Sequence, residues 1–321
     1  MDREPQEEAA DEAFAQFEEA LDETKKRKTL TFLLVGRTGV GKSSTVNSLL
    51  GDEIAPVGDF APTTAEVKLY PGVVNGVSFN VVDTPGFCDD LEEVGNDERY
   101  LAEIRRKAPA LDCVWFVTRL SETRVTSDEK RAIKLLCGAF GETFWKHAVV
   151  VFTHAGQVGA DKYEFTLAER TRLVLGEVAK HLGETIAEDV PSVAVDNTQP
   201  HTPDGKPWLG ELFTTVIERL GDDSSLPFLL ALADDIEPAK VKRKRKEKAG
   251  SSGGGNASTH TPRIELDESQ RKRVGSKIDS GVIAGGVMAG GAIGAVLGGP
   301  VGAAIGAAAG GVIGIVTWLL G

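Results

Sequence analysis

The sequence predicts an α/β fold in which a mainly parallel sheet carries helices on both faces. Two observations lead to this prediction. Along residues 29–236, short apolar runs alternate with amphipathic stretches of helical length. Polar motifs able to bind a ligand follow directly after several of these runs. Alternating strands and helices are typical of βαβ units, and ligands of such sheets bind at the carboxyl ends of the strands.

The expected strands are short apolar runs bounded by polar or turn-forming residues. They cover residues 30–35, 68–70, 77–82, 113–117, 148–152 and 192–195. The helical patterns between them include residues 127–140 and 163–181, where apolar residues recur at helical spacing. We therefore expect one domain over residues 29–236, with appendages on both sides.

The composition limits the classes of function. A net charge of −12 over 321 residues argues against a nucleic-acid-binding surface, so no nucleic acid is expected as a partner. The three cysteines have no metal-ligand spacing and are expected to be buried thiols in a reducing compartment: Cys88, Cys113 and Cys137. The first residues are acidic and lack an apolar signal core, so the sequence predicts neither a secretory signal nor a transit peptide.

Both flanks of the domain differ from it in composition. Residues 1–28 are rich in Glu, Asp and Ala, with apolar residues at helical spacing, so we expect an acidic leader helix. Residues 237–278 are expected to form a basic, flexible linker. Its run 240–248 is dominated by Lys and Arg, and Gly and Ser dominate residues 249–256.

Residues 279–321 are expected to be a membrane anchor. No charged residue occurs in 281–320, and about 20 apolar residues suffice to cross a bilayer. Glycine recurs at every fourth position from Gly286 to Gly314, which would form a seam of small residues along a transmembrane helix. The Gly-Gly-Pro at 298–300 leaves a helical hairpin and a single kinked span both open, and a disordered tail is the soluble alternative. Basic residues precede the run and none follows it, which predicts a cytosolic domain.

The segment 36–43, G-R-T-G-V-G-K-S, has the G-x-x-x-x-G-K-[ST] pattern of a phosphate loop. It lies between the expected strand 30–35 and an expected helix, so backbone N–H groups and the helix dipole would face an anion. Lys42 would reach the β and γ phosphates, and the Ser43 hydroxyl would bind Mg²⁺. The candidate nucleotide-binding residues here are Arg37, Thr38, Gly39, Val40, Gly41, Lys42, Ser43 and Ser44.

A second motif, D-T-P-G at residues 83–86, follows the expected strand 77–82. In a phosphate-loop protein, D-x-x-G at this place predicts that Asp83 reaches Mg²⁺ through water and that the Gly86 N–H meets the γ-phosphate. A simple turn is the structural alternative. Between the two motifs, Thr64 is expected to close over Mg²⁺ and the γ-phosphate, with Thr63 as the alternative.

Two further motifs follow later strands. The strand 148–152 ends in T-H-A-G at 153–156, without the N-K-x-D that commonly recognises guanine, and the strand 192–195 ends in D-N-T. T-H-A followed by an acidic-Asn pair resembles the Toc-type GTPases of the plastid outer envelope and the related AIG-type, or GIMAP-like, GTPases. The resemblance extends through residues 29–53 and 111–155.

The resemblance implies a P-loop GTPase domain that binds GTP or GDP with Mg²⁺. It implies that His154, Asp196 and Asn197 hold the guanine. Arg124 matches the arginine that crosses a homodimer toward the partner's nucleotide, where it would stabilise transition-state charge or lock the dimer. Arg119 is the neighbouring candidate, and a solvated arginine or a local salt bridge is the alternative for Arg124.

Slow hydrolysis is expected from two replacements. Phe87 stands where Ras-like proteins carry a water-orienting Gln, and Thr38 stands where they carry a glycine. Hydrolysis would therefore depend on a dimer or a partner that supplies the missing group.

The resemblance further implies a membrane-anchored switch on an organelle surface, with the plastid outer envelope as the expected location. Its partners would be a second copy of the chain, the membrane and the basic transit peptides of imported proteins. Two alternatives stay open. One is a GIMAP-like scaffold whose oligomerisation on a membrane is driven by GTP. The other is a membrane assembly protein whose glycine seam is regulated by the G domain.

Overall fold

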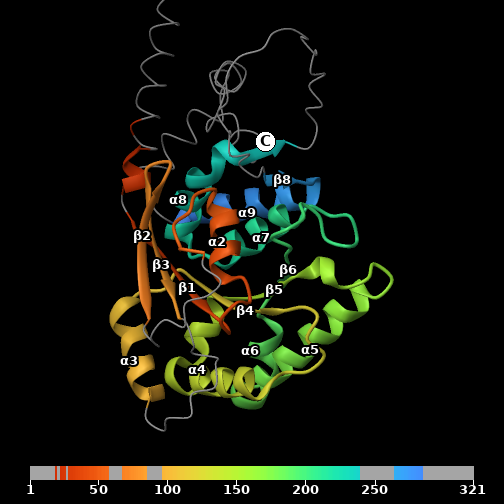
Figure 1. Cartoon of the computed structure of the whole chain (residues 1–321). Coiled ribbons are helices and arrows are strands. Elements are labelled where there is room, and N and C mark those ends of the chain that lie inside the picture. The colour runs from red at the N-terminus through yellow and green to blue at the C-terminus, as the bar shows by residue number, and fades with distance from the viewer. Residues whose placement is uncertain are drawn as a thin grey trace, which may run out of the picture.

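A computed structural model describes residues 19, 22–26, 28–57, 67–84, 96–238 and 264–284 (Figure 1). Within these residues, the central sheet has six strands in the order β2-β3-β1-β4-β5-β6. All are parallel except β2, which pairs antiparallel with β3 at one edge. Their bounds are β1 Leu30–Val35, β2 Lys68–Val74, β3 Val77–Asp83, β4 Cys113–Arg119, β5 Ala148–Thr153 and β6 Ser192–Ala194. The predicted, mainly parallel sheet is confirmed.

Helices cover both faces of this sheet (Figure 1). One face carries α2 Lys42–Leu50, α7 Trp208–Arg219, α8 Asp222–Leu232 and α9 Glu268–Ala284, and the other carries α3 Asn96–Lys107, α4 Ser127–Lys146, α5 Tyr163–Leu182 and α6 Glu184–Glu188. In β1, Phe32 and Leu34 belong to the first core, and Leu33 and Val35 to the second. Because alternate side chains of a strand face opposite sides, a strand buried on both faces is mostly apolar along its whole length.

Two elements extend well beyond their predicted ends. Strand β2 continues to Val74 and turns into β3 through Asn75 and Gly76, which both have positive φ. Asn-Gly is a preferred hairpin pair because both residues tolerate that conformation. Helix α4 continues past residue 140 to Lys146, with a kink at Gly141 (φ 62°, ψ −152°). The kink explains why the regular apolar pattern stops where the prediction ended.

The prediction of a flexible linker over residues 237–278 is wrong for its last part, residues 264–278. Strand β7, Ile236–Pro238, pairs in parallel with β8, Ile264–Leu266, and α9 follows and packs on α7 and α8. The buried side chains Val274 and Ile278 of α9 join the core beside the sheet. The many charges of this segment suggested a solvated tether, but the apolar positions recur at strand and helix spacing and are buried.

Local contacts explain why the segment folds there. The Asp267 side chain accepts a hydrogen bond from Gln270 N at 2.8 Å, and the Gln270 side chain accepts one from Asp267 N at 2.9 Å, so the two residues cap the start of α9. At Gly210 in α7, a Cβ atom would lie 2.0 Å from the Glu265 carbonyl oxygen. Only glycine therefore allows β8 to pack this closely on α7.

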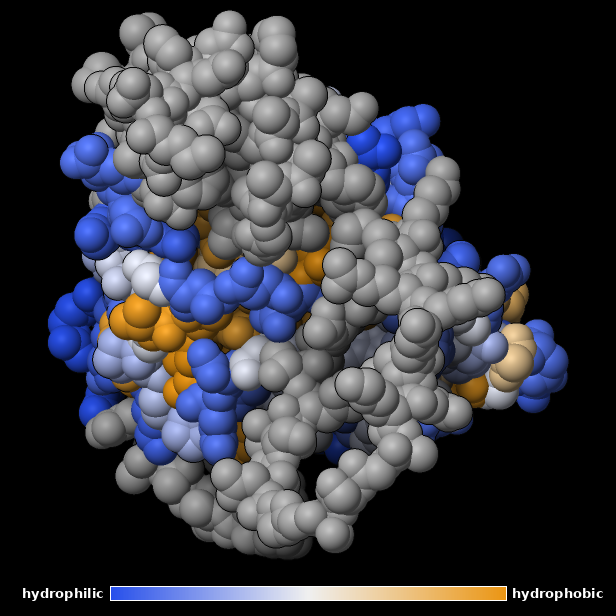
Figure 2. Space-filling model, turned by 90° about the horizontal axis from the view of Figure 1, so that it is seen from above, coloured by the Kyte–Doolittle hydropathy of each residue, from blue (hydrophilic) through white to orange (hydrophobic). Residues whose placement is uncertain are grey.

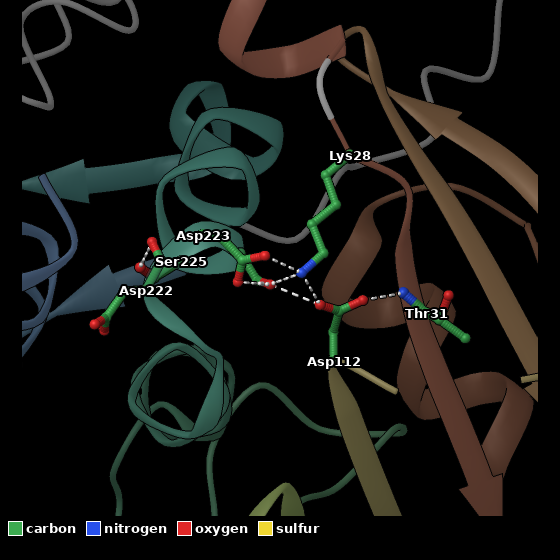
Figure 3. Close-up of polar contacts among 7 residues, drawn as sticks. Lys28, Thr31, Asp112, Asp222, Asp223 and Ser225 are labelled. Carbon is green, nitrogen blue, oxygen red and sulfur yellow. Dashed lines mark hydrogen bonds and ion pairs between the residues drawn. The ribbon is translucent and has the colours of Figure 1, made fainter. Parts of the chain in front are cut away.

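An ion-pair cluster joins the amino ends of the central strands to α8 (Figure 3). Lys28 Nζ lies 2.8 Å from Asp112 Oδ1 and 2.6 Å from Asp223 Oδ2, and donates to Ser224 Oγ at 2.8 Å. The other Asp112 oxygen accepts a hydrogen bond from Thr31 N at 2.8 Å. We call Lys28, Asp112, Asp223 and Ser224 the amino-edge cluster. It fixes the start of α8 against the starts of β1 and β4.

Several predicted features lie outside the described residues: leader residues 1–18, the basic run 240–248 and anchor residues 285–321. Among the residues that are described, no helix has the length and apolar character needed to cross a bilayer. Seen from above, the described residues show mainly hydrophilic side chains around smaller apolar areas (Figure 2).

Candidate functional site

The predicted phosphate loop connects β1 to α2 and passes directly against β4. At Gly36, a Cβ atom would lie 2.2 Å from the Val117 carbonyl oxygen, so no larger residue fits without moving the backbone. Val40 is buried in the first core, whereas Thr38 and Gly39 are exposed. Arg37, Ser43 and Ser44 are half-buried. The loop is thus anchored on the sheet while its turn faces outward.

Lys42 begins α2 and folds back over this loop. Its side chain is buried, and Nζ donates to the carbonyl oxygens of Gly36 at 2.9 Å and Arg37 at 3.1 Å. The same Nζ lies 3.8 Å from Asp83 Oδ1, at the end of β3. The structure therefore brings together the loop, its lysine and the acidic residue of the D-T-P-G motif.

The Asp83 carboxylate is placed where a cation would stabilise it. Burial raises its pKa, and Lys42 and the Thr84 N–H oppose this shift. Its buried Oδ1 accepts no hydrogen bond from any described residue. Thr84 is fully buried and donates to the Leu34 carbonyl oxygen through both N, at 3.2 Å, and Oγ1, at 2.9 Å. That contact fixes the start of the D-T-P-G segment on β1.

The rest of that segment lies outside the described residues, as do both candidate threonines before it. This applies to Thr63, Thr64, Gly86 and Phe87. Their predicted roles at Mg²⁺, at the γ-phosphate and in slow hydrolysis stay predictions.

Thr153, at the end of β5, connects two strands to the phosphate loop. Its Oγ1 donates to the Val40 carbonyl oxygen at 2.6 Å and lies 3.3 Å from the Thr118 carbonyl oxygen. This role of Thr153 was not predicted from the sequence. The signal was a polar residue ending an otherwise apolar strand, immediately before the conspicuous His154.

His154 has a left-handed backbone conformation (φ 57°, ψ 37°) and is half-buried. Burial and the nearby positive charge of Arg119 lower its pKa, while Asp196 opposes the shift, so the imidazole is neutral near pH 7. Its Nδ1 lies 3.0 Å from Thr153 Oγ1. Because the Thr153 hydroxyl donates to Val40, Nδ1 carries the ring proton and Nε2 is left as an acceptor.

Asp196, which follows β6, holds two loops in place. Its Oδ2 accepts from Gly156 N at 2.5 Å, and its Oδ1 accepts from Thr198 N at 2.9 Å and Thr198 Oγ1 at 2.6 Å. Burial would raise the pKa of Asp196, but hydrogen bonds from Thr198, Gly156 and Gln199 outweigh it and lower the pKa. Both carboxylate oxygens are therefore engaged within the protein. The guanine contact expected of Asp196 stays a prediction, and bracing the T-H-A loop is what the structure shows.

Asn197 turns toward α2. Its Nδ2 donates to Thr45 Oγ1 at 2.9 Å, and Thr45 Oγ1 donates to the Gly41 carbonyl oxygen at 2.8 Å. The buried Asn197 Oδ1 has no hydrogen-bond partner among the described residues. The acidic-Asn pair thus lies beside the phosphate loop, as its position after a parallel strand predicts.

The two candidate arginines differ in their surroundings. Arg119 ends β4, and its Nη2 donates to the Gly39 carbonyl oxygen at 3.0 Å, so this arginine contacts the phosphate loop of its own chain. Arg124 lies between β4 and α4, where its side chain is exposed. Within the described part of the chain, its guanidinium forms no ion pair; its backbone carbonyl accepts a hydrogen bond from Arg170 Nη1 at 2.9 Å.

Residues following five strands therefore meet at the carboxyl edge of the sheet. Backbone N–H groups at the start of α2, Lys42 and the orphaned Asp83 oxygen suit a phosphate group with a divalent cation. Among the described residues, no cluster of three His, Cys, Asp or Glu side chains is arranged to hold a metal by itself. A cation bound here would take some of its ligands from a bound phosphate.

Comparisons with known proteins agree with this architecture. The chain is 28% identical over 218 residues to "Translocase of chloroplast 101, chloroplastic" from Physcomitrium patens. The matched region covers 62% of this chain and 24% of that protein. It is 27% identical over 210 residues to "Translocase of chloroplast 34, chloroplastic" from Arabidopsis thaliana, covering 59% of this chain and 65% of that protein. The chain thus spans about a quarter of the first relative and just under two thirds of the second.

A solved structure shows the same fold. It is a dimerisation-deficient mutant of Toc33 from Arabidopsis thaliana, with a TM-score of 0.51 and 23% sequence identity. The match covers 68% of this chain and 91% of the Toc33 chain. The P-loop GTPase fold predicted from the motifs is therefore confirmed. The model of the AIG1 family matches residues 30–190, half of the chain, and these residues include β1, the phosphate loop and the T-H-A motif. This chain belongs to the AIG1 family.

Proposed function

We propose that this chain is a GTP-binding switch that hydrolyses GTP slowly and acts on a membrane surface. The observation that carries the proposal is the convergence of the phosphate loop, Lys42 and Asp83 at one edge of the sheet, with Lys42 Nζ 3.8 Å from Asp83 Oδ1. Membership of the AIG1 family and the translocase relatives support the same function.

The phosphates of the nucleotide would bind to the loop 36–41, the start of α2 and Lys42. Mg²⁺ would be held by Ser43 and, through water, by Asp83, with Thr64 closing over it. The orphaned oxygen of Asp83 fits this role because burial alone disfavours its negative charge and a cation would restore it. When bound, Mg²⁺ neutralises charge that develops on the phosphates during hydrolysis.

Guanine would be recognised by the loops after β5 and β6. The N1–H and N2–H groups of guanine are donors, and the His154 Nε2 left free by the Thr153 contact is an acceptor. Asp196 would hold the His154 loop through Gly156 N, and Asn197 would contribute an amide next to α2. Together, His154, Asp196 and Asn197 would replace the single aspartate of an N-K-x-D motif.

Hydrolysis would be completed in a homodimer formed through the G domain. Arg124 is exposed and unpaired within the described residues, so a second copy can receive it near its phosphates. Arg119 already contacts its own loop, which favours Arg124 for the role across the dimer. The Toc33 structure is that of a dimerisation-deficient mutant, and this supports the proposal that the present chain also forms a dimer.

The setting we propose is the plastid outer envelope. The chain would be anchored through its C-terminal apolar residues, with the G domain in the cytosol. The translocase relatives support a role in protein import, with basic transit peptides as clients. A GIMAP-like membrane scaffold and a glycine-zipper assembly protein are the alternatives, and the uncharged glycine-rich run 281–320 favours a membrane setting for all three.

The nucleotide proposal is tested by binding of a fluorescent GTP analogue to the full chain. Lys42→Ala should weaken binding at least about tenfold, because it removes a charged donor from a buried phosphate site. Lys130→Ala, on the exposed side of α4, should bind like the parent. Unlabelled GTP should displace the probe and ATP should not. Equal displacement by ATP would refute guanine recognition, and unchanged binding by Lys42→Ala would refute the site.

The anchor is tested by cutting the chain after Ala284 rather than earlier, because α9 packs on the G domain. The full chain should sediment with membranes and resist extraction at high salt. The shortened chain should stay in the supernatant and still bind GTP. Equal partitioning of the two chains would overturn the anchor.

A further inference from the structure

A buried polar network lies directly behind the segment that carries Arg124. It consists of Thr118 on β4, Glu129 on α4 and Arg170 on α5, and we call it the carboxyl-edge network. Each of the three side chains is at most 3% exposed. Arg170 Nη2 lies 2.6 Å from Glu129 Oε1 and 2.9 Å from Thr118 Oγ1, and the Thr118 hydroxyl also donates to Glu129 Oε1. Charges this deeply buried are tolerated only when each is paired and hydrogen-bonded.

The network also holds the backbone of residues 124–126. Arg170 Nη1 donates to the Arg124 carbonyl oxygen at 2.9 Å. Glu129 Oε2 accepts from Thr126 N at 2.8 Å, and Thr126 Oγ1 accepts from Glu129 N at 3.2 Å, which is the reciprocal cap of α4. The segment is therefore fixed at both ends by two buried charges that are paired with each other.

The same network reaches the phosphate loop through Thr118. The Thr118 carbonyl oxygen lies 3.3 Å from Thr153 Oγ1, which donates to the Val40 carbonyl oxygen. Next along β4, Arg119 donates to the Gly39 carbonyl oxygen. A continuous series of contacts thus runs from the phosphate loop, through the end of β4, to the backbone of Arg124; those of Thr153 and Thr118 are buried, and the last, from Arg170 to Arg124, is partly buried.

We propose that Arg170 is a positioning residue that fixes the Arg124 segment relative to the phosphate loop, so that Arg124 is presented to a second copy of the chain. This inference rests on the proposed role of Arg124 in the dimer. Holding the backbone in its bound geometry lowers the entropy lost on association. The planar guanidinium is suited to the task because it serves Glu129, Thr118 and the Arg124 carbonyl at once.

The test is Arg170→Lys in the full chain, measured by sedimentation with a non-hydrolysable GTP analogue. Lysine keeps a positive charge beside Glu129, but its single ammonium group cannot serve three acceptors in the fork geometry of arginine. We expect dimer affinity to fall about tenfold, because the Arg124 segment is no longer held in its bound geometry. GTP affinity of the monomer should stay unchanged, because Arg170 itself contacts none of the described residues proposed to bind the nucleotide of its own subunit.

Arg172→Lys is the matched control. Arg172 lies two residues further along α5 and also pairs with a glutamate, Glu169, but its side chain is 68% exposed. Its substitution should leave dimer affinity unchanged. An equal loss in both variants would refute the proposal.

A double-mutant cycle with Arg124→Ala separates positioning from simple stabilisation of the fold. If Arg170 acts through Arg124, Arg170→Lys should weaken the dimer no further once Arg124 is alanine. Fully additive losses, or parent-like dimerisation of Arg170→Lys, would overturn the inference. If Arg124→Ala itself dimerises like the parent, the proposed role of Arg124 fails instead.

A second variant keeps the inference testable if Arg170→Lys does not fold. Arg170→Gln combined with Glu129→Gln removes both charges together, so no lone charge stays buried. The glutamine at 129 can still accept from Thr126 N and preserve the cap of α4. The same loss of dimer affinity, again absent in the Arg124→Ala background, is expected. Parent-like dimerisation would contradict the inference.

Discussion

The amino-edge cluster and the carboxyl-edge network use the same chemistry at opposite ends of the sheet, but they differ in exposure. Arg170 and Glu129 are each at most 3% exposed. Lys28 and Asp223 are 31% and 71% exposed. Water screens the second pair and can replace either partner, whereas nothing replaces a lost partner in the first. We therefore expect burial, more than the number of contacts, to decide how much each cluster stabilises the fold.

The largest effect should come from breaking the buried pair. Arg170→Met leaves Glu129 charged and unpaired in the interior, which should lower the free energy of unfolding by about 3–5 kcal/mol. Urea unfolding of the full chain, at a fixed nucleotide concentration, measures the change. Adding Glu129→Gln should restore more than half of the loss, since it removes the stranded charge. If Arg170→Met alone were as stable as the parent, water would have to reach the network and solvate Glu129.

A smaller effect is expected at the amino-edge cluster. Lys28→Met removes the ion pairs to Asp112 and Asp223, but Asp112 keeps its hydrogen bonds from Thr31 N and Ser224. The free energy of unfolding should fall by only about 1 kcal/mol, because the ion pair is partly solvated. Lys26→Met, at an exposed position nearby, is the control and should unfold like the parent. A loss as large as that of Arg170→Met would contradict the comparison.

The amino-edge cluster should also respond to acid. The hydrogen bond from Lys28 lowers the pKa of Asp223, while burial opposes it, so the folded chain holds this proton less tightly than the unfolded chain. Its stabilising contribution is therefore complete above the ordinary carboxyl pKa of about 3.9 and is lost as the pH falls through the lowered folded value.

Asp223→Asn should remove that component. The difference in urea midpoint between pH 7 and pH 3 should become smaller in the variant, by the equivalent of less than about 1 kcal/mol because the carboxylate is mostly exposed. An unchanged difference would show that other carboxylates, such as Asp196, dominate the acid response.

The smallest effect is expected from the exposed pair on α5. Arg172→Lys should leave the free energy of unfolding unchanged, because Glu169 and Arg172 are both largely solvated. Its midpoint in the same urea titration should overlap that of the parent. A loss similar to that of Lys28→Met would show that exposure alone does not explain the difference between the two clusters.

The amino-acid sequence predicted the structure correctly where the signal was local. Strands β1, β4 and β5 follow from apolar runs, because a strand buried on both faces is mostly apolar. It failed at β8 and α9, where the charges of 265–277 concealed apolar residues that become buried only against α7 and α8. Within the site, Lys42 and Asp83 could be predicted from motifs, whereas the contact of Thr153 with Val40 could not.

The sequence by itself determined the fold class, the phosphate loop and the family, because each depends on residue types within a short span. Only the tertiary structure decided that Glu129 and Arg170 form one buried pair with the Arg124 backbone, and that Arg119 contacts its own loop. The physical reason is that these contacts join residues far apart in the chain. Whether a charge is solvated, paired or stranded depends on which elements pack around it, and the packing exists only in the folded molecule.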